Sequence, residues 1–345
     1  MPIRLLNIDL HISVITDVLY ILKDIYGDNV DIKNHSISGH NWVFGRGTAV
    51  VDIVNQDTWK DINEEMINKF MEHYTAYFSN FDGFIVTHTP IFALLYEKFN
   101  KPVIVVNSCR YEQPYSWKND LTSWKWLNNK LANMKNLHII SNNKADQEYL
   151  KLGTGLDSIH IPSLCLYTNE KYTGTKDEVI KHGSLKEGYQ WGELYSYKGI
   201  YHIPYEISTM SIFEQYSANV PLLFPSKKHL KELGGTKSLY GTELPQELSV
   251  CKDIDWWIDR ADYYDEENMK YITYFDNEED LQEKIKSLVY TKISELMTEH
   301  NKTRKEKVYT QWKTFFDSIF ENQLKQNNVE EVNKNAIAER SGESV

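Results

Sequence analysis

Short apolar runs alternate with amphipathic stretches along the first 165 residues. Residues 3–10 form an apolar run that predicts a strand. Residues 12–26 carry apolar side chains every three or four positions, which predicts a helix with one apolar face. This alternation is typical of a parallel sheet covered by helices on both sides. Further strands are expected at residues 84–87, 102–106, 137–140 and 159–161, and further helices at residues 91–99 and 144–152.

The second half repeats the alternation after a polar stretch, residues 166–175, whose composition is typical of a linker. A long helix is expected from about residue 289 to residue 320, and the polar residues after it predict a frayed tail. Between the linker and this helix, strands are expected at residues 199–203, 221–224 and 271–275, and helices at residues 211–218 and 278–288.

A chain of 345 residues is long enough for two domains of ordinary size. The pattern predicts the α/β fold class, with two Rossmann-like doubly wound domains that face each other across a cleft. We expect residues 1–165 to form the first domain and residues 166–300 the second. Residues 301–320 are expected to form a helix that crosses back to the first domain, and residues 321–345 a flexible tail.

Composition narrows the function classes. Lys and Arg number 38 against 49 Asp and Glu, and the net charge of −11 argues against a surface that binds nucleic acid through its phosphates. No apolar run approaches the roughly 20 residues of a membrane-spanning helix, and no signal-peptide pattern is visible, so we expect a cytoplasmic protein. Cys109, Cys165 and Cys251 are too widely spaced for a zinc knuckle or a disulfide framework. The oligomeric state stays open.

The segment from Tyr205 to Pro221 follows a predicted strand, opens a helix and ends at another strand. Its carboxylates Glu206 and Glu214 are expected to face the crevice at the carboxyl end of the sheet, where open α/β sheets bind ligands. The first backbone N–H groups of the helix suit a diphosphate, and a carboxylate such as Glu214 suits two ribose hydroxyls. These N–H groups belong to Thr209, Met210, Ser211 and Ile212.

This segment resembles the signature of GT-B-fold glycosyltransferases, especially the retaining family 4 type, in which two glutamates separated by seven residues precede a Gly-x-Pro and a strand. The resemblance implies that Glu206 lies beside the donor sugar and that Glu214 binds the ribose of the nucleotide. Asn219 stands in place of the family's glycine, and Ile207-Ser-Thr in place of Gly-Phe-Gly. The sequence after the first strand also differs from the glycine-rich loop of the family.

The resemblance implies an activity as well as a fold. The chain would move a sugar, without a metal ion, from a nucleotide-diphosphate sugar to a carbohydrate or other hydroxyl acceptor, with retention. No cofactor is expected beyond this donor substrate. Further donor contacts are expected from Lys186, in the loop where GT-B enzymes usually place a basic side chain near the phosphates, and from Tyr205, which suits sugar stacking.

His11 follows the first strand directly, where inverting GT-B enzymes carry a His general base. It is therefore the expected base if the reaction inverts, and Asp9 and Asp17 are near enough in sequence to orient it. Other loops combine a cation with aromatic side chains, which suits stacking on an acceptor sugar. The expected acceptor residues are Arg110, Tyr111, Tyr115, Trp117 and His40.

Structural roles stay open for the same residues. Ser211-x-x-Glu214 also fits a capping box, Glu206 also fits an ordinary loop acid, and His11 also fits a residue that caps a helix or bonds to the backbone. Two other functions stay open as well. One is a non-catalytic protein that binds a sugar or a protein partner, and the other is a nucleotide-sugar epimerase of the non-hydrolysing type.

A metal site is not expected. Asp253-Ile-Asp255 matches the DxD motif that holds a divalent cation in GT-A transferases. However, no strand is predicted before it, and Trp256-Trp257 indicate the start of a packed helix.

Overall fold

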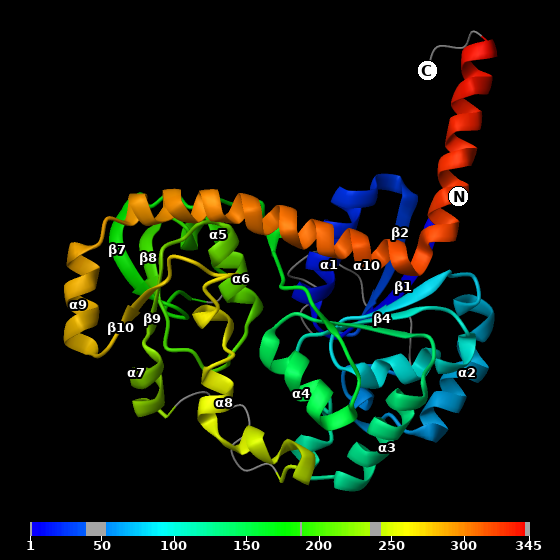
Figure 1. Cartoon of the computed structure of the whole chain (residues 1–345), viewed down its shortest axis with the longest axis horizontal. Coiled ribbons are helices and arrows are strands. Elements are labelled where there is room, and N and C mark those ends of the chain that lie inside the picture. Colours follow the sequence, from blue (N-terminus) through cyan, green and yellow to red (C-terminus); the bar gives the residue numbers. More distant parts are fainter. Residues whose placement is uncertain (1, 39–52, 187, 235–242, 342–345) are drawn as a thin grey trace.

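Two separate parallel sheets lie side by side in the computed structural model, which describes residues 2–38, 53–186, 188–234 and 243–341 (Figure 1). The six strands of the first sheet all lie before residue 161, and the four strands of the second all lie after residue 175. The chain therefore has the predicted α/β architecture of two Rossmann-like domains.

The first sheet has the strand order β2-β1-β3-β4-β5-β6. Strand β1 pairs with β2 on one side and with β3 on the other, so the order reverses beside it. Strands β3 and β4 are buried throughout, which explains their unbroken apolar sequences. The strands are β1 (Ile3–Asp9), β2 (Val30–Ser36), β3 (Gly83–Val86), β4 (Val103–Asn107), β5 (Leu137–Ser141) and β6 (Ile159–His160), and the helices are α1 (Ile12–Tyr26), α2 (Glu64–Phe78), α3 (Leu121–Asn133) and α4 (Lys144–Thr154).

The second sheet has the order β10-β9-β8-β7. Edge strand β7 was not predicted, because most of its side chains are exposed and its sequence carries no apolar run. The strands are β7 (Lys176–Lys181), β8 (Tyr197–Tyr201), β9 (Leu222–Pro225) and β10 (Thr273–Phe275), and the helices are α5 (Trp191–Leu194), α6 (Met210–Ser217), α7 (Lys227–Glu232), α8 (Ile254–Ile258), α9 (Glu278–Ser287) and α10 (Tyr290–Ser341).

Short 3₁₀ helices complete the fold. The predicted helix at residues 91–99 is one of them, because the chain winds as a 3₁₀ helix over Pro90–Phe99, with its first seven side chains buried. The others are Gly27–Asn29, Thr58–Asp61, Ser116–Lys118, Leu166–Thr168, Gln246–Lys252 and Asp262–Tyr264.

Helix α10 runs along both domains (Figure 1). Near its start, the ring of Tyr290 covers Gly199 of β8, where an added Cβ would lie 2.8 Å from the ring. At Phe320 the backbone leaves helical geometry, and this ring covers Gly83 of β3, where an added Cβ would lie 3.0 Å away. One helix therefore packs closely on a glycine in each sheet.

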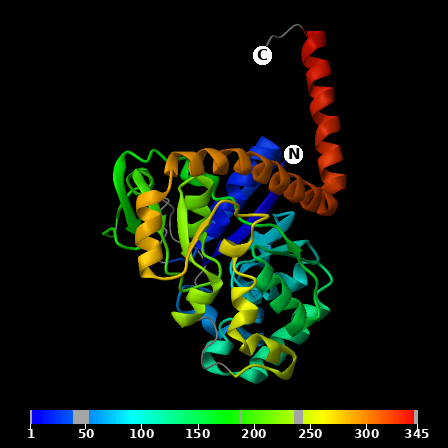
Figure 2. The ribbon, with the colours of Figure 1, turned by 60° about the vertical axis from the view of Figure 1, so that its left-hand side comes forward.

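The chain stays helical beyond the predicted end of the long helix at residue 320. After Phe320 the chain turns and continues as helix to Ser341, and this part projects away from both domains (Figures 1 and 2). The helix also begins at Tyr290, ten residues before the predicted end of the second domain at residue 300.

Arg304 fixes the middle of α10 to the junction of the domains. Its buried guanidinium donates from Nε to the Asn268 side-chain oxygen at 2.8 Å and from Nη1 to the Ser217 hydroxyl at 2.9 Å. It also donates to the carbonyl of Ser163, in the segment that leads from β6 toward the second domain. This side chain therefore joins three segments that are far apart in sequence.

We predict that Arg304→Met lowers the free energy of unfolding by about 3 kcal/mol, because the change leaves buried acceptors without their donor. Lys302→Met on the same helix is the control. Lys302 pairs with Glu299 at an exposed position, so its loss is expected to change stability by less than about 0.5 kcal/mol. Urea denaturation followed by circular dichroism measures both. Equal stability of the two variants would contradict the role assigned to Arg304.

Candidate functional site

A cavity of about 410 Å³ lies between the domains and is lined from both. Two larger hollows, of about 580 and 610 Å³, lie along α1 and are lined mainly by α1, β2 and α10. The interdomain cavity is the better candidate, because it lies where strands of both sheets end. The first domain contributes His11, Ser108, Cys109, Arg110, Gln113 and Asp146, and the second contributes Tyr205, Glu206, Ser208, Thr209, Met210 and Ser211.

His11 reaches the cavity because it directly follows β1 at the point where the strand order reverses. It occupies the N-cap position of α1, but its side chain makes no capping hydrogen bond, which removes the helix-cap interpretation. His88 follows the neighbouring strand β3, and the two imidazole centroids lie 6.3 Å apart. Burial, with a smaller contribution from His11, lowers the pKa of His88 to about 3, so His88 is neutral.

Asp17 does not orient His11. Its buried carboxylate accepts backbone N–H groups from Leu164, at 3.0 Å, and Cys165, at 2.6 Å. Burial raises the pKa of Asp17 to about 6 despite these bonds. Asp17 therefore joins α1 to the segment between the domains.

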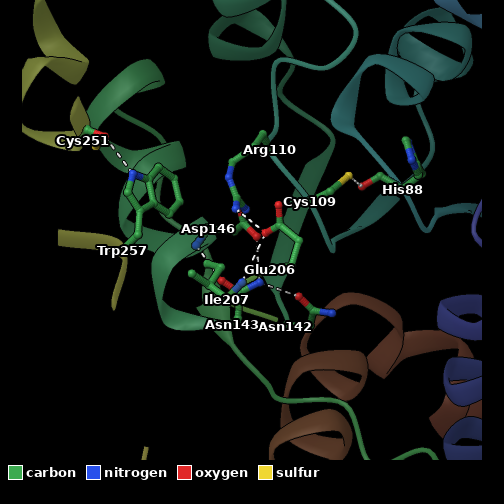
Figure 3. Close-up of polar contacts among 10 residues, drawn as sticks. All are labelled: His88, Cys109, Arg110, Asn142, Asn143, Asp146, Glu206, Ile207, Cys251 and Trp257. Carbon is green, nitrogen blue, oxygen red and sulfur yellow. Dashed lines mark hydrogen bonds and ion pairs between the residues drawn. The ribbon is translucent and has the colours of Figure 1, made fainter. Parts of the chain in front are cut away.

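Arg110 is the centre of charge in the cavity. Its Nη1 donates to Asp146 at 2.7 Å, and its Nη2 donates to Glu206 of the other domain at 2.9 Å (Figure 3). The guanidinium also lies over the Trp257 ring, 4.3 Å from the centroid. Burial alone would lower the pKa of Arg110, but the carboxylates raise it above its ordinary value. A cation from the first domain thus binds the glutamate that the sequence assigned to the donor sugar.

The N-terminus of α6 forms the opposite wall. Thr209 is the N-cap residue, and Thr209, Met210 and Ser211 all line the cavity. Among the described residues, none accepts a hydrogen bond from these three N–H groups. The N–H of Ile212, also predicted to be open, instead donates to the Thr209 carbonyl at 3.1 Å. Three open N–H groups therefore remain at this helix end.

Glu214 lies one turn further along α6 and does not line the cavity. It accepts hydrogen bonds from the Tyr167 hydroxyl at 2.5 Å and from the Trp191 indole N–H at 3.3 Å. The capping box is not formed, because Thr209 rather than Ser211 is the N-cap. Burial raises the pKa of Glu214 to about 7, although both donors lower it. Glu214 therefore stands between two aromatic side chains, and one of them, Tyr167, lines the hollow along α1.

Several predicted residues lie elsewhere. Tyr111 is fully buried, accepting a hydrogen bond from the Trp124 indole at 2.8 Å, and Tyr115 is buried with its hydroxyl on the Ile62 carbonyl at 2.9 Å. Both are core residues, so neither is available to stack on an acceptor.

Trp117 is exposed and packs edge-on against Trp59, with ring centroids 5.7 Å apart, but it does not line the cavity. Lys186 is exposed on the loop between β7 and α5 and is also outside the lining. Tyr205 is 65% exposed at the rim. His40 lies outside the described residues, so its predicted role stays a prediction.

The DxD motif has structural partners. The Asp253 side chain caps α8 by accepting the Asp255 N–H at 3.0 Å, and Asp255 pairs with Lys231. In the described ranges no group of three or more His, Cys, Asp or Glu is arranged to hold a metal ion. No helix within those ranges is long and apolar enough to cross a bilayer.

The sequence did not indicate three partners of the cavity residues: Asp146, which lines the cavity, and Trp257 and His88, which contact Arg110 and His11 from behind it. Asp146 lies in the first turn of α4, just after β5, and Trp257 comes from α8, which the chain brings back from the second half onto Tyr149 of α4. The position of His88 after β3 repeats that of His11 after β1, a signal that strand adjacency would have revealed. Nothing local indicated Trp257 as a partner of Arg110.

No protein-family model matches the sequence. No curated protein matches it either. Several solved structures have a similar architecture, all at low identity. CalG4, the calicheamicin glycosyltransferase, is 8% identical and aligns over 92% of this chain and 99% of its own, with a TM-score of 0.47. SnogD, a glycosyltransferase from Streptomyces nogalater, is 8% identical over 91% and 100%, with a TM-score of 0.47.

A protein from Listeria monocytogenes, provisionally assigned as a UDP-N-acetylglucosamine 2-epimerase, is 13% identical over 76% of this chain and 92% of its own, with a TM-score of 0.45. These are likenesses in architecture.

We predict that the pKa of Glu214 makes stability depend on pH. Its pKa is about 7 in the native chain against 4.5 ordinarily, so the contribution to stability is complete below 4.5 and is lost as pH rises through 7. From pH 5 to pH 8, the free energy of unfolding should therefore fall by about 2 kcal/mol more in the parent than in Glu214→Gln. Urea denaturation at each pH measures the difference, and a constant difference would contradict the burial of this carboxylate.

Proposed function

We propose that the chain is a glycosyltransferase that moves a sugar, without a metal ion, from a nucleotide-diphosphate sugar to a hydroxyl acceptor. One observation carries the proposal. Glu206 and the open N-terminus of α6, from the second domain, face His11 of the first domain across a single cavity. This arrangement places a carboxylate, three N–H donors and an imidazole around one space large enough for the reacting groups.

The second domain holds the donor in this proposal. The N–H groups of Thr209, Met210 and Ser211 receive the diphosphate, because a helix N-terminus carries partial positive charge. Glu214 receives the ribose hydroxyls, and its neighbours Tyr167 and Trp191 offer faces to the nucleoside. A carboxylate with two aromatic neighbours and a pKa near neutrality suits a polar but uncharged ligand group.

The reacting centre lies between the donor and the first domain. Glu206 contacts the donor sugar, and Tyr205 at the rim stacks on it. The departing diphosphate gains negative charge in the transition state, and prearranged N–H groups stabilise this charge without reorganisation. We propose a retaining reaction on the basis of the Glu206 and Glu214 spacing, with His11 contacting the acceptor. In an inverting reaction His11 would be the general base.

Acceptor contacts come from the first domain in this proposal. Arg110, Ser108 and Gln113 line that wall, and Trp117 and His40 stay proposed contacts from neighbouring loops. Because these cavity groups are polar, they suit an acceptor with several hydroxyls, such as a carbohydrate.

We predict that at least one of UDP-, GDP-, ADP- and CDP-sugars raises the melting temperature. At a ligand concentration 100 times the dissociation constant, binding should add about 2.7 kcal/mol to the free energy of unfolding. Glu214→Ala should weaken this ligand about 10-fold to 100-fold, because a carboxylate hydrogen bond to each hydroxyl is lost. Glu193→Ala, an exposed acid on α5, is the matched control and should bind like the parent. Differential scanning fluorimetry measures the shifts in melting temperature, and the absence of a shift with every nucleotide sugar would contradict the proposal.

We predict that Glu206→Gln lowers kcat for sugar transfer about 100-fold, because its carboxylate contacts the donor sugar in the transition state. Proton NMR of the product should show the anomeric configuration of the donor. Inversion, together with a kcat loss of about 100-fold in His11→Gln, would overturn retention and assign His11 as the base. Conversion of the sugar without an acceptor would instead show an epimerase, and binding without any turnover a binding protein.

A further inference from the structure

The interdomain cavity contains an unusual distribution of positive charge. Among the described residues that line it, Arg110 is the sole lysine or arginine, and it comes from the first domain. The cation expected from the second domain, Lys186, is exposed and outside the lining. For a ligand with two phosphoryl groups that enters at the N-terminus of α6, this guanidinium is therefore the cation that the described lining offers.

Not all N–H donors of the Arg110 guanidinium are engaged by the two carboxylates. A guanidinium has five N–H donors. In the described part of the chain, two of them are engaged, one by Asp146 and one by Glu206. Its Nε is buried and has no hydrogen-bond partner there. The planar fork matches the geometry of phosphate oxygens better than an ammonium does.

The two carboxylates that hold Arg110 differ in how firmly they are fixed. The Asp146 side chain is 1% exposed, and its second oxygen accepts a hydrogen bond from the Asn143 amide at 2.7 Å (Figure 3). The Glu206 side chain is 30% exposed and belongs to the loop between β8 and α6, and besides Arg110 its Oε2 accepts the N–H of the adjacent Ile207 at 3.3 Å. Asp146 is therefore the fixed partner, and Glu206 is the partner that a ligand can displace.

We propose that Arg110 is the cation that binds the phosphoryl groups of the ligand, and that these groups take the place of Glu206 on its Nη2. This inference rests on the proposed function and deepens it. The displaced Glu206 carboxylate then contacts the donor sugar, so phosphate binding prepares the sugar site. The role of Arg110 changes accordingly, from the acceptor contact expected from the sequence to a donor contact supplied by the other domain.

If phosphoryl groups displace Glu206, substitutions of Glu206 and of Arg110 should change the affinity for diphosphate in opposite directions. Glu206→Gln removes the competing carboxylate, so inorganic diphosphate should bind about 10-fold more tightly than to the parent. Arg110→Gln with Asp146→Asn removes the cation together with its fixed carboxylate, which avoids an unpaired buried charge, and should weaken binding at least about 10-fold. Isothermal titration calorimetry with inorganic diphosphate, and then with UDP and GDP, measures these constants.

A second interdomain pair supplies a matched control. Arg260 pairs with Glu148 at 2.7 Å and lies over the Trp256 ring, 4.4 Å from the centroid, but it does not line the cavity. Arg260→Gln with Glu148→Gln removes the same charges from a more exposed ion pair, and it should leave diphosphate affinity unchanged. A loss as large as in the Arg110 variant would show a general effect of charge and overturn the proposal.

Three other results would also overturn it. These are no diphosphate binding by the parent, an affinity unaffected by Glu206→Gln, and a loss of affinity in Lys186→Met as large as in the Arg110 variant. Failure of the anion site and failure of the proposed function give different results. Diphosphate binding with the expected pattern, but no turnover of any nucleotide sugar, would support the anion site and contradict the glycosyltransferase. Turnover with a diphosphate affinity indifferent to Arg110 and Glu206 would do the reverse.

Discussion

Burying a guanidinium between two domains is the constraint on which the candidate site depends. An isolated charge of this kind costs several kcal/mol to remove from water, so Arg110 requires carboxylates and a packing surface. Asp146 supplies one carboxylate, Glu206 supplies another from the other domain, and the Trp257 ring supplies the packing surface. The same contacts that neutralise the charge therefore determine which faces of the two domains meet, and they place the Glu206 loop beside the N-terminus of α6.

Parallel topology explains why the polar groups gather where they do. Strands β1 and β3 are neighbours and end at the same edge, so His11 and His88 lie together although 77 positions separate them in the chain. The second sheet contributes the loop after β8 and the start of α6 in the same way. The segment 246–258 then returns to pack on α4, which brings Trp257 under Arg110. The cavity is thus a product of topology more than of any single motif.

Much of the fold was predictable, because strands buried on both faces have no polar positions. Strand β7 was not predicted, because it is an exposed edge strand without an apolar run. The inward direction of some aromatic side chains was not predicted either, because it depends on partners that are distant in sequence. Tyr111 turns inward because Trp124 donates to its hydroxyl, a partner that no local pattern reveals. The ion pairs of Arg110 span 36 and 96 positions, beyond the reach of periodicity. Glu206 and the α6 terminus were found because their chemistry lies within one short segment.

The length of helix α10 sets the distance between its contacts with the two sheets. Tyr290 and Phe320 are 30 positions apart, a span of about 45 Å at the helical rise of 1.5 Å per residue, and each ring covers a glycine of a different sheet. Inserting or deleting one residue between them would turn one ring by roughly 100° relative to the other, away from its glycine. Substitutions on the outer face of this helix leave both contacts in place, whereas a change in its length alters the spacing of the domains.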